Sequence, residues 1–375
     1  MKKNILFLTL KTFSFTGGIE KMCRILTRSL YDLSSSDRVD VNVYSMYDTN
    51  IDRDSRYITK QQFRGFKEQR TRFVLRSIIK GFFSDIVILS HINLLFIAYI
   101  INAISPSTRI ILYAHGIEVW RKISNKKRNF LSTKCEVWAV SEFTSIQLQQ
   151  IHKIPSKCIT VLPNCLDPFL EIPDYFEKPL VLLHRYRLSE SQPVLFTLSR
   201  LSSYELYKGY DMVLEILPYL ITQYPTIQYL LAGQADIKEK KRLEELVKTL
   251  KITNHVSFIG FIPDEELSDY FRLADIFIMP SRKEGFGIVF IEAAACGCKI
   301  IGGDQDGSPQ ALLNGKLGNL INPEHKESLL SAVIENLNIK RSNNSSKAVQ
   351  KLCLENFNYL QYSRNVHVLL LNEVS

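Results

Sequence analysis

Short apolar runs alternate with segments of helical periodicity along nearly the whole chain. Such alternation is typical of parallel α/β domains, in which a helix follows each strand and packs on the sheet. The chain has 375 residues, which is long for one hydrophobic core and predicts two domains. The strands that we expect are, in chain order, Ile5–Thr9, Val39–Ser45, Asp85–Ser90, Arg109–Ala114, Val137–Val140, Thr160–Leu162, Val194–Leu198, Ile227–Ala232, Val256–Ile259, Ile276–Met279 and Lys299–Gly302.

A turn-rich stretch, residues 163–192, separates the two series of strands and carries four prolines. Because this stretch lacks the period of a strand or a helix, we interpret it as an interdomain connector. We therefore expect a first domain over residues 1–165 and a second over residues 166–357. The remaining segment, 358–375, contains a helix-like run from Tyr359 to Leu371.

The composition is that of a globular protein with an excess of basic residues. Hydrophobic residues make up 46% of the chain and charged residues 23%, and the formal net charge is +9. This excess suits nucleic acid, an anionic membrane or a phosphorylated substrate, and does not choose among them. The seven cysteines are scattered without zinc-ligand spacing, which favours a reducing cytoplasm.

Two segments bear on membrane contact. The nearly apolar segment 86–104 approaches spanning length, but its polar residues favour a strand followed by a helix over a transmembrane span. The segment 64–83 mixes six basic with several apolar side chains, a composition that suits a helix lying on anionic lipid. An ordinary domain helix with a charged outer face explains 64–83 equally well, and the net charge favours the membrane slightly.

Polar residues gather in the loops of one stretch, 280–309. A turn at Pro280 follows a predicted strand, a helix-like segment begins near Ile288, and a second strand leads into a Gly/Asp/Pro loop. Parallel α/β sheets bind ligands at such loops. Within the stretch, seven residues separate Glu284 from Glu292.

The spacing of these two glutamates suggests an elongated ligand. Eight residues of helix advance about 12 Å, so the two carboxylates would hold two hydroxyl-bearing rings separated by a linker. A nucleotide-diphosphate sugar has this shape. Gly285 and Gly287 would let the backbone approach it, and the following helix offers N–H groups to phosphate. Two glutamates at this spacing are also common on solvated helices.

The residues that flank the two glutamates favour a ligand site over a solvated helix. The run EGFGIVFIEAAACG, with PS before it and GSP after it, resembles the signature of the retaining GT-B glycosyltransferases of family 4. The resemblance implies two Rossmann-like domains facing across a cleft, with residues 358–375 crossing back onto the first. It also implies that a sugar is moved from a UDP- or GDP-sugar to a hydroxyl acceptor with retention, without a metal or other cofactor.

The resemblance assigns the donor site mainly to the second domain. Glu284 would hold the transferred sugar, and Glu292 the ribose. Arg200 and Lys208, which match an R-L…K-G pattern, would neutralise the diphosphate, although a surface charge pair is the plainer explanation. The backbone would contact the nucleotide base and the rest of the donor at Phe261, Ile262, Phe286, Gly287 and Ile288.

The first domain would add three elements to this site. Gly17 and Gly18 resemble the family's GGI-E loop, whose backbone faces the donor diphosphate; they also suit a plain turn before a helix. His115, which ends a predicted strand, matches the family histidine beside the reaction centre. Asn164 resembles a residue near the hinge, where a turn-forming role is as good an explanation, and Cys165 replaces the usual glycine.

The triplet Asp304-Gln305-Asp306 could be mistaken for the metal-binding D-x-D of the other glycosyltransferase fold. It precedes Ser308 where the family has a G-G-x-P-E loop, so we expect a turn near the donor sugar and no metal. Gln310 takes the usual glutamate position, which puts in doubt any role of that charge.

The sequence leaves the acceptor and several other functions open. The basic segment and the usual role of the family suggest a lipid-linked or saccharide acceptor, as in surface polysaccharide or glycolipid assembly. They also suggest a cytoplasmic protein at the inner face of the membrane. A GT-B phosphorylase, a nucleotide-sugar epimerase and a non-catalytic nucleotide-sugar-binding partner of an assembly complex are alternatives. Nucleic acid is not expected as a partner, because no recognised motif is present.

Overall fold

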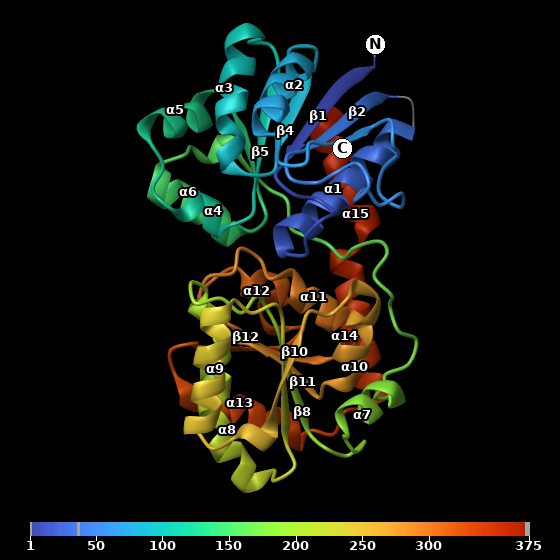
Figure 1. The fold of residues 1–375 in the computed structure, drawn as a ribbon, viewed down its shortest axis with the longest axis vertical. Helices are drawn as coiled ribbons and strands as arrows, with labels where there is room; N and C mark the ends of the chain where they lie inside the picture. The colour runs from blue at the N-terminus through green and yellow to red at the C-terminus, as the bar shows by residue number, and fades with distance from the viewer. Residues whose placement is uncertain (1, 36–37, 372–375) are drawn as a thin grey trace. The chain divides into compact units, whose positions relative to one another are not determined.

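The computed structural model describes residues 2–35 and 38–371, which form two compact units (Figure 1). The first unit contains the chain as far as Pro168 together with the helix α15 (Tyr359–Leu371). The second unit is Phe169–Asn358. Helix α15 joins the first unit by packing on α1 (Gly18–Ser35), where Tyr359 donates a hydrogen bond to Asp32 at 2.5 Å.

The first unit is built on a seven-stranded parallel sheet with the order β3-β2-β1-β4-β5-β6-β7. Its strands are β1 (Lys3–Thr9), β2 (Val39–Ser45), β3 (Phe63–Gly65), β4 (Ile86–Leu89), β5 (Arg109–Ala114), β6 (Glu136–Ala139) and β7 (Ile159–Val161). Besides α1 and α15, its helices are α2 (Arg70–Phe82), α3 (Leu95–Ile104), α4 (Ile117–Trp120), α5 (Asn125–Thr133) and α6 (Glu142–His152).

The second unit is built on a six-stranded parallel sheet with the order β10-β9-β8-β11-β12-β13. Its strands are β8 (Val194–Leu198), β9 (Gln228–Ala232), β10 (Val256–Gly260), β11 (Ile276–Met279), β12 (Lys299–Gly303) and β13 (Asn319–Ile321). Its helices are α7 (Leu180–Tyr186), α8 (Tyr210–Gln223), α9 (Ile237–Thr249), α10 (Leu267–Leu273), α11 (Ile288–Ala295), α12 (Ser308–Ala311), α13 (Lys326–Asn338) and α14 (Asn343–Phe357).

Every strand predicted from the apolar runs is present, with ends that differ by a residue or two. The prediction missed β3 and β13, two edge strands of three residues each, although it found β7, an edge strand of the same length. Strands this short give only a weak pattern. It was also wrong to read 163–192 as free of regular structure, because α7 lies within it. The basic segment 64–83 is not one helix: its first residues form β3 and a turn, and α2 starts at Arg70.

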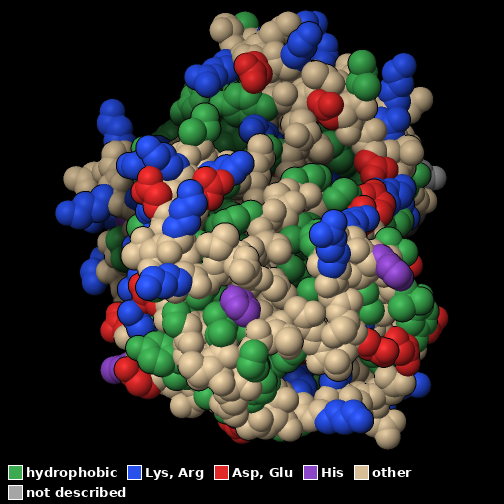
Figure 2. Space-filling view, turned by 60° about the horizontal axis from the view of Figure 1, so that its bottom comes forward, with side chains coloured by type: hydrophobic (Ala, Val, Ile, Leu, Met, Phe, Trp, Pro, Cys, Tyr) green, Lys and Arg blue, Asp and Glu red, His purple; other side chains and the backbone are tan. Residues whose placement is uncertain are grey.

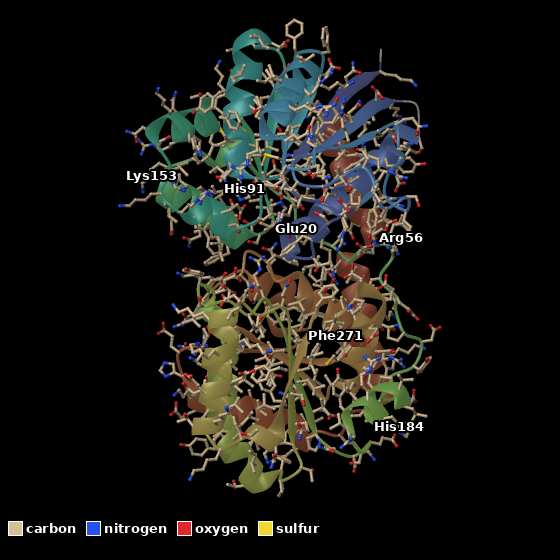
Figure 3. The ribbon with its side chains drawn as sticks, in the orientation of Figure 1. Glu20, Arg56, His91, Lys153, His184 and Phe271 are labelled. Atoms are coloured by element: carbon tan, nitrogen blue, oxygen red, sulfur yellow. The ribbon has the colours of Figure 1, made fainter. Side chains whose placement is uncertain are left out.

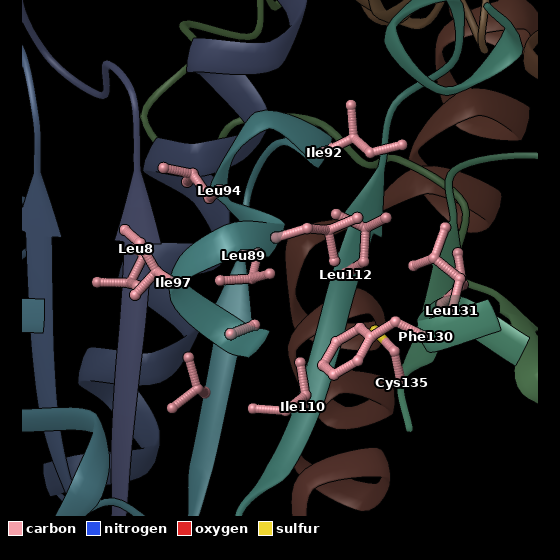
Figure 4. Packing of buried hydrophobic residues seen from close by; sticks show 14 of the residues in the cluster. Leu8, Leu89, Ile92, Leu94, Ile97, Ile110, Leu112, Phe130, Leu131 and Cys135 are labelled. Atoms are coloured by element: carbon pink, nitrogen blue, oxygen red, sulfur yellow. The ribbon is translucent and has the colours of Figure 1, made fainter. Parts of the chain in front are cut away.

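The core of the first unit shows how the helices cover the sheet. One apolar cluster joins Phe73 of α2 and Ile97 and Ile101 of α3 to inward-facing residues of β1, β4 and β5, including Leu89 and Leu112 (Figure 4). Because these side chains belong to one cluster, α2 and α3 lie on the same face of the sheet. A second cluster occupies the corresponding place in the second unit.

The apolar segment 86–104 divides into β4 and the ten-residue helix α3, as predicted. Ten residues of helix advance about 15 Å, half of what a hydrocarbon core requires. Throughout the described residues, no helix is both long enough and apolar enough to cross a membrane.

Candidate functional site

The strand order of the second unit identifies where a ligand site is expected. From β8 the chain proceeds through β9 to β10 on one side, whereas β11, β12 and β13 extend on the other side. The neighbours β8 and β11 therefore flank the topological switch point, where loops diverge and open sheets of this kind bind ligands. The loop after β8 carries Arg200 and Lys208, and the loop after β11 carries Glu284.

The two loops are held together by close backbone contact. The amide of Arg282 donates a hydrogen bond to the carbonyl of Tyr207 at 2.9 Å. Gly209 has a φ of +81°, and a Cβ there would lie 2.3 Å from the carbonyl oxygen of Pro280. Only glycine meets both conditions, so Gly209 lets the loop after β8 approach the loop after β11.

Lys208 and Glu284 form an ion pair between these loops. The ammonium of Lys208 donates to Oε1 of Glu284, and the two side chains are 16% and 13% exposed. A partly buried pair is screened by water less than a surface pair. The structure thus brings together a cation and a carboxylate that the sequence suggested separately.

Asp306 organises the backbone that carries Glu284. Its buried carboxylate accepts hydrogen bonds from the hydroxyl of Ser281 at 2.5 Å, the amide of Glu284 at 2.7 Å and the amide of Ser308 at 2.8 Å. The triplet 304–306 lies in a bend, in line with the expected turn, and Asp304 and Gln305 are exposed. Sequence reasoning missed this positioning role, because two of the three donors, Ser281 and Glu284, lie in the loop after β11, 25 and 22 residues away in the chain.

Burial raises the pKa of Asp306 from 3.8 to about 6, and the nearby charge of Glu284 adds to the rise against the hydrogen bonds. A carboxyl whose pKa is raised by folding stabilises the folded state below its unfolded pKa, and this contribution is lost as the pH rises through the folded pKa. We therefore expect ionisation of Asp306 to lower the unfolding free energy by about 3 kcal/mol between roughly pH 4 and pH 7. Asp306→Asn should remove this part of the pH dependence.

Chemical denaturation of both proteins at these two pH values measures the effect. Asp304→Asn is the matched control, since Asp304 is exposed two residues away. If Asp306→Asn and the wild-type chain showed the same pH dependence, the raised pKa of Asp306 would be wrong.

Arg200 and Glu292 occupy different surroundings from the central pair. Arg200 is 52% exposed and pairs with Glu205 at 3.0 Å. Glu292 lies on α11 and is only 2% exposed. Because α11 begins at Ile288, Glu284 lies in the preceding loop, and the estimate of eight helical residues between the glutamates was wrong.

The start of α11 combines a left-handed glycine with buried aromatic packing. Gly287 has a φ of +86°, which favours glycine, and a Cβ there would lie 2.5 Å from the ring of Phe290. Phe286 is buried, with its ring 5.8 Å from that of Phe357, and Ile288 is half-buried. The side chain of Phe286 therefore has a packing role, which leaves only its backbone to contact a donor.

Phe261 and Ile262 follow β10 and differ in exposure. Phe261 is 56% exposed, whereas Ile262 is buried. The preceding Gly260 accepts a hydrogen bond on its carbonyl from the amide of Gly233 at 2.8 Å, which links the ends of β10 and β9. The exposed ring of Phe261 is thus a surface on which a planar group can stack.

In the first unit, β1 and β4 flank the switch point in the same way. The loop after β1 leads to Gly17 and to Gly18, the first residue of α1. Buried Asp48 accepts hydrogen bonds from the amides of Thr12 at 2.7 Å and Ser14 at 2.9 Å. Asp48 therefore shapes the loop before the glycine pair, a role that sequence reasoning missed because Asp48 follows a different strand.

His115 lies after β5 with an unsatisfied ring nitrogen. Its Nε2 is buried and has no hydrogen-bond partner in the described part of the chain. Burial, and secondly His91, lower the pKa of His115 to about 3, so its ring is neutral at physiological pH. A neutral imidazole with a free ring nitrogen can donate a hydrogen bond to a hydroxyl or accept one from it, depending on its tautomer.

Two further residues near His115 were not predicted. His91, which follows β4 at the switch point, is marked in Figure 3. The carboxylate of Glu118 accepts a hydrogen bond from the amide of His115 at 2.5 Å, and burial raises the pKa of Glu118 to about 7. A titratable residue directly after a strand at the switch point was the available signal for His91.

Asn164 and Ser308 are both buried. The Oδ1 of Asn164 accepts a hydrogen bond from Tyr113 at 3.4 Å, and Cys165 beside it is buried as well. These contacts favour a packing role for Asn164. Among residues 2–35 and 38–371, no three His, Cys, Asp or Glu side chains group so that they could hold a metal ion.

Part of the second unit matches a known protein family. Residues 184–351 match the family model described as Glycosyl transferases group 1. The matched segment contains Arg200, Lys208, Glu284 and Glu292.

Relatives of known activity share part of the sequence. The chain is 31% identical, over 60% of its length and 60% of the relative, to GDP-mannose-dependent alpha-(1-6)-phosphatidylinositol monomannoside mannosyltransferase of Mycolicibacterium smegmatis. It is 32% identical to mannosylfructose-phosphate synthase of Agrobacterium fabrum, over 39% of this chain and 33% of that one. The chain thus spans less than two thirds of the curated relatives that it matches.

Solved structures resemble the whole chain. HepE of Anabaena in complex with UDP-glucose has a TM-score of 0.79 at 19% identity, over 98% of this chain and 99% of that one. Sucrose-phosphate synthase from Thermosynechococcus elongatus has a TM-score of 0.77 at 17% identity, over 99% of both chains. These similarities and the two parallel sheets confirm the predicted GT-B fold of two Rossmann-like domains.

Proposed function

We propose that this protein is a retaining glycosyltransferase that moves a sugar from a UDP- or GDP-sugar to a hydroxyl acceptor. The ion pair of Lys208 with Glu284, at the switch point of the second unit, is the observation that carries the proposal. It lies inside the segment that matches the group 1 glycosyltransferases. Ligand chemistry is expected at this place in the sheet, and both residue types suit a phosphorylated sugar.

In this mechanism the second unit binds the donor. Lys208 neutralises the charge that grows on the departing diphosphate, and the N–H groups at the start of α11 assist it. Glu284 orients the transferred sugar through its hydroxyls, and Glu292 holds the ribose. Arg200 provides a second, more exposed positive charge for the diphosphate. To bind it, Arg200 would leave its ion pair with Glu205.

We assign no covalent role to Glu284. A retaining glycosidase needs a second carboxylate across the scissile bond. The nearby Asp306 is buried and already accepts three hydrogen bonds, so it suits positioning and not attack. We therefore propose a same-face reaction without a metal, in which the leaving phosphate helps to deprotonate the acceptor hydroxyl. The neutral His115 would contact a sugar hydroxyl beside the reaction centre.

We propose a lipid-linked or saccharide acceptor, in glycolipid or surface polysaccharide assembly. The relative from Mycolicibacterium smegmatis acts on a phosphatidylinositol mannoside, by its name, which supports a lipid-linked acceptor. We further propose that the protein acts in the cytoplasm at the inner face of a membrane, with the segment 64–83 as its contact.

The donor is tested first by thermal unfolding with a panel of UDP-, GDP- and ADP-sugars. A bound donor raises the unfolding temperature according to its concentration relative to its Kd. The stabilising donor is then incubated with candidate acceptors, and nucleotide release is measured. Release that depends on the acceptor supports a transferase. Conversion of the donor sugar without an acceptor indicates an epimerase, and phosphate-dependent release of a sugar phosphate indicates a phosphorylase.

Two alternatives from other classes make different predictions. A non-catalytic partner of an assembly complex would bind a nucleotide-sugar without turnover; the intact set Arg200, Lys208, Glu284 and Glu292 argues against it. A nucleic-acid binder should show a continuous basic face. On the face drawn in Figure 2, Lys and Arg are interspersed with Asp and Glu, which argues against that function for this face.

A further inference from the structure

Two helices of the first unit expose apolar side chains that the core does not use. On α2 and directly after it, the exposed residues follow helical spacing, and those on α3 recur every fourth residue. All are between 41% and 65% exposed. We call them the α2–α3 surface: Leu75, Ile79, Phe82, Phe83, Phe96, Ile100 and Ile104.

Tertiary packing joins the two stripes. Figure 1 shows α2 and α3 side by side, and the side chains on their buried sides enter one core cluster. A Cβ on Gly81 of α2 would lie 2.3 Å from Cδ1 of Ile101 on α3, so the helices touch closely there. Because both helices cover the same face of the sheet, their exposed stripes point away from it on the same side.

The two helices that carry this surface have charges of one sign only. Residues 69–84 contain Arg70, Arg72, Arg76 and Lys80 and no Asp or Glu, and α3 carries no charged residue. Arg72 and Arg76 are exposed beside Leu75 and Ile79. Lys80 is half-buried, with Asp40 at 3.8 Å. An apolar stripe flanked by cations is the pattern of helices that lie in the interface of an anionic membrane.

The end of α2 adds an aromatic pair. Phe82 and Phe83 are 46% and 65% exposed, with ring centroids 4.9 Å apart. A protein surface in water gains nothing from exposing two adjacent phenyl rings, whereas rings inserted among acyl chains are removed from water.

We propose that the α2–α3 surface docks on an anionic membrane, with the apolar side chains inserted and Arg72 and Arg76 at the phosphate groups. The inference deepens the proposed function by naming the membrane-facing surface: it replaces the segment 64–83 by α2 and α3. Residues 64–69 are not part of the surface, because they form β3 and a turn. Helix α3, whose sequence carries no charge, supplies nearly half of the apolar side chains.

Vesicle co-sedimentation of the full chain tests the proposal without donor or acceptor, so that its outcome is separate from that of sugar transfer. The chain is expected to bind phosphatidylcholine vesicles that contain phosphatidylglycerol, and to bind phosphatidylcholine alone far less. The double variant Arg72→Gln/Arg76→Gln should bind about 25-fold more weakly, since each cation near an anionic surface contributes about fivefold. The matched control is the double variant Lys126→Gln/Arg128→Gln, which removes two exposed cations from α5 and should bind vesicles as the wild type does.

The apolar contribution has its own variants. Ile79→Ser/Ile100→Ser, one residue from each helix, should weaken vesicle binding about tenfold or more, because less apolar surface is inserted. Ile146→Ser/Ile151→Ser on α6 removes side chains of similar exposure near β7 and should leave binding unchanged. Equal binding of the test and control variants overturns the proposal. The proposal is also overturned if the wild type is a dimer and Ile79→Ser/Ile100→Ser dissociates it. The α2–α3 surface would then be covered by a second copy of the chain.

Discussion

Glu284→Ala is expected to reduce sugar transfer about a thousandfold, because it removes the group that orients the transferred sugar. The substitution also removes the partner of Lys208, which is mostly buried, so the cation loses its fixed position. The loss should appear mainly in kcat. Acceptor-dependent nucleotide release under saturating donor measures it.

Two companion variants separate the chemistry of Glu284 from folding. Glu265→Ala removes an exposed carboxylate from the same unit and should leave both transfer and the unfolding temperature unchanged. Glu284→Gln keeps the shape of the side chain and should still lose most of the activity, since an amide pairs with Lys208 more weakly than a carboxylate does. Wild-type turnover by Glu284→Ala would refute the assignment of this residue.

Lys208→Ala is expected to lower transfer roughly 10²- to 10³-fold, the usual cost of removing one group that stabilises transition-state charge. The effect should fall on both donor affinity and turnover, because the diphosphate is charged before the reaction and more so as it leaves. It should exceed the effect of Arg200→Ala, since Arg200 is 52% exposed and already paired with Glu205. Initial rates over a range of donor concentrations give kcat and KM for each variant.

The comparison of the two cations provides the internal control. Both variants lose one positive charge from the same loop, so a long-range electrostatic effect would weaken them equally. A larger loss in Arg200→Ala than in Lys208→Ala would contradict the central role of the ion pair. Lys238→Ala, on α9 of the same unit, should have no effect on either constant.

The sequence predicted the elements of the fold well because each is encoded by neighbouring residues. Apolar runs indicated every interior strand of both sheets and the edge strands β7 and β10. The run EGFGIVFIEAAACG indicated the loop and helix that carry Glu284 and Glu292. Two edge strands, β3 and β13, were missed, whereas β7 of the same length was found, because three residues give too weak a pattern to be detected reliably. The helix α7 escaped because it is a single short helix between prolines.

The positioning residues of the site could not be predicted in this way. Asp48 and Asp306 act on loops that follow other strands, and nothing in their immediate sequence distinguishes them from carboxylates in ordinary turns. Lys208 and Glu284 are 76 residues apart, and their contact depends on β8 and β11 being neighbours in the sheet. Strand order is a property of long-range packing, which no local period reports.

The amino-acid sequence by itself determined two parallel α/β domains and the residue types available at the ends of their strands, since periods of two and 3.6 residues act over a few neighbours. Only the tertiary structure decided which of these residues meet: the Lys208–Glu284 pair, the contact of Asp306 with Ser281 and Glu284, and the single apolar surface of α2 and α3. Each of these depends on burying side chains against partners that are distant in the chain, and that burial is settled when the sheets assemble.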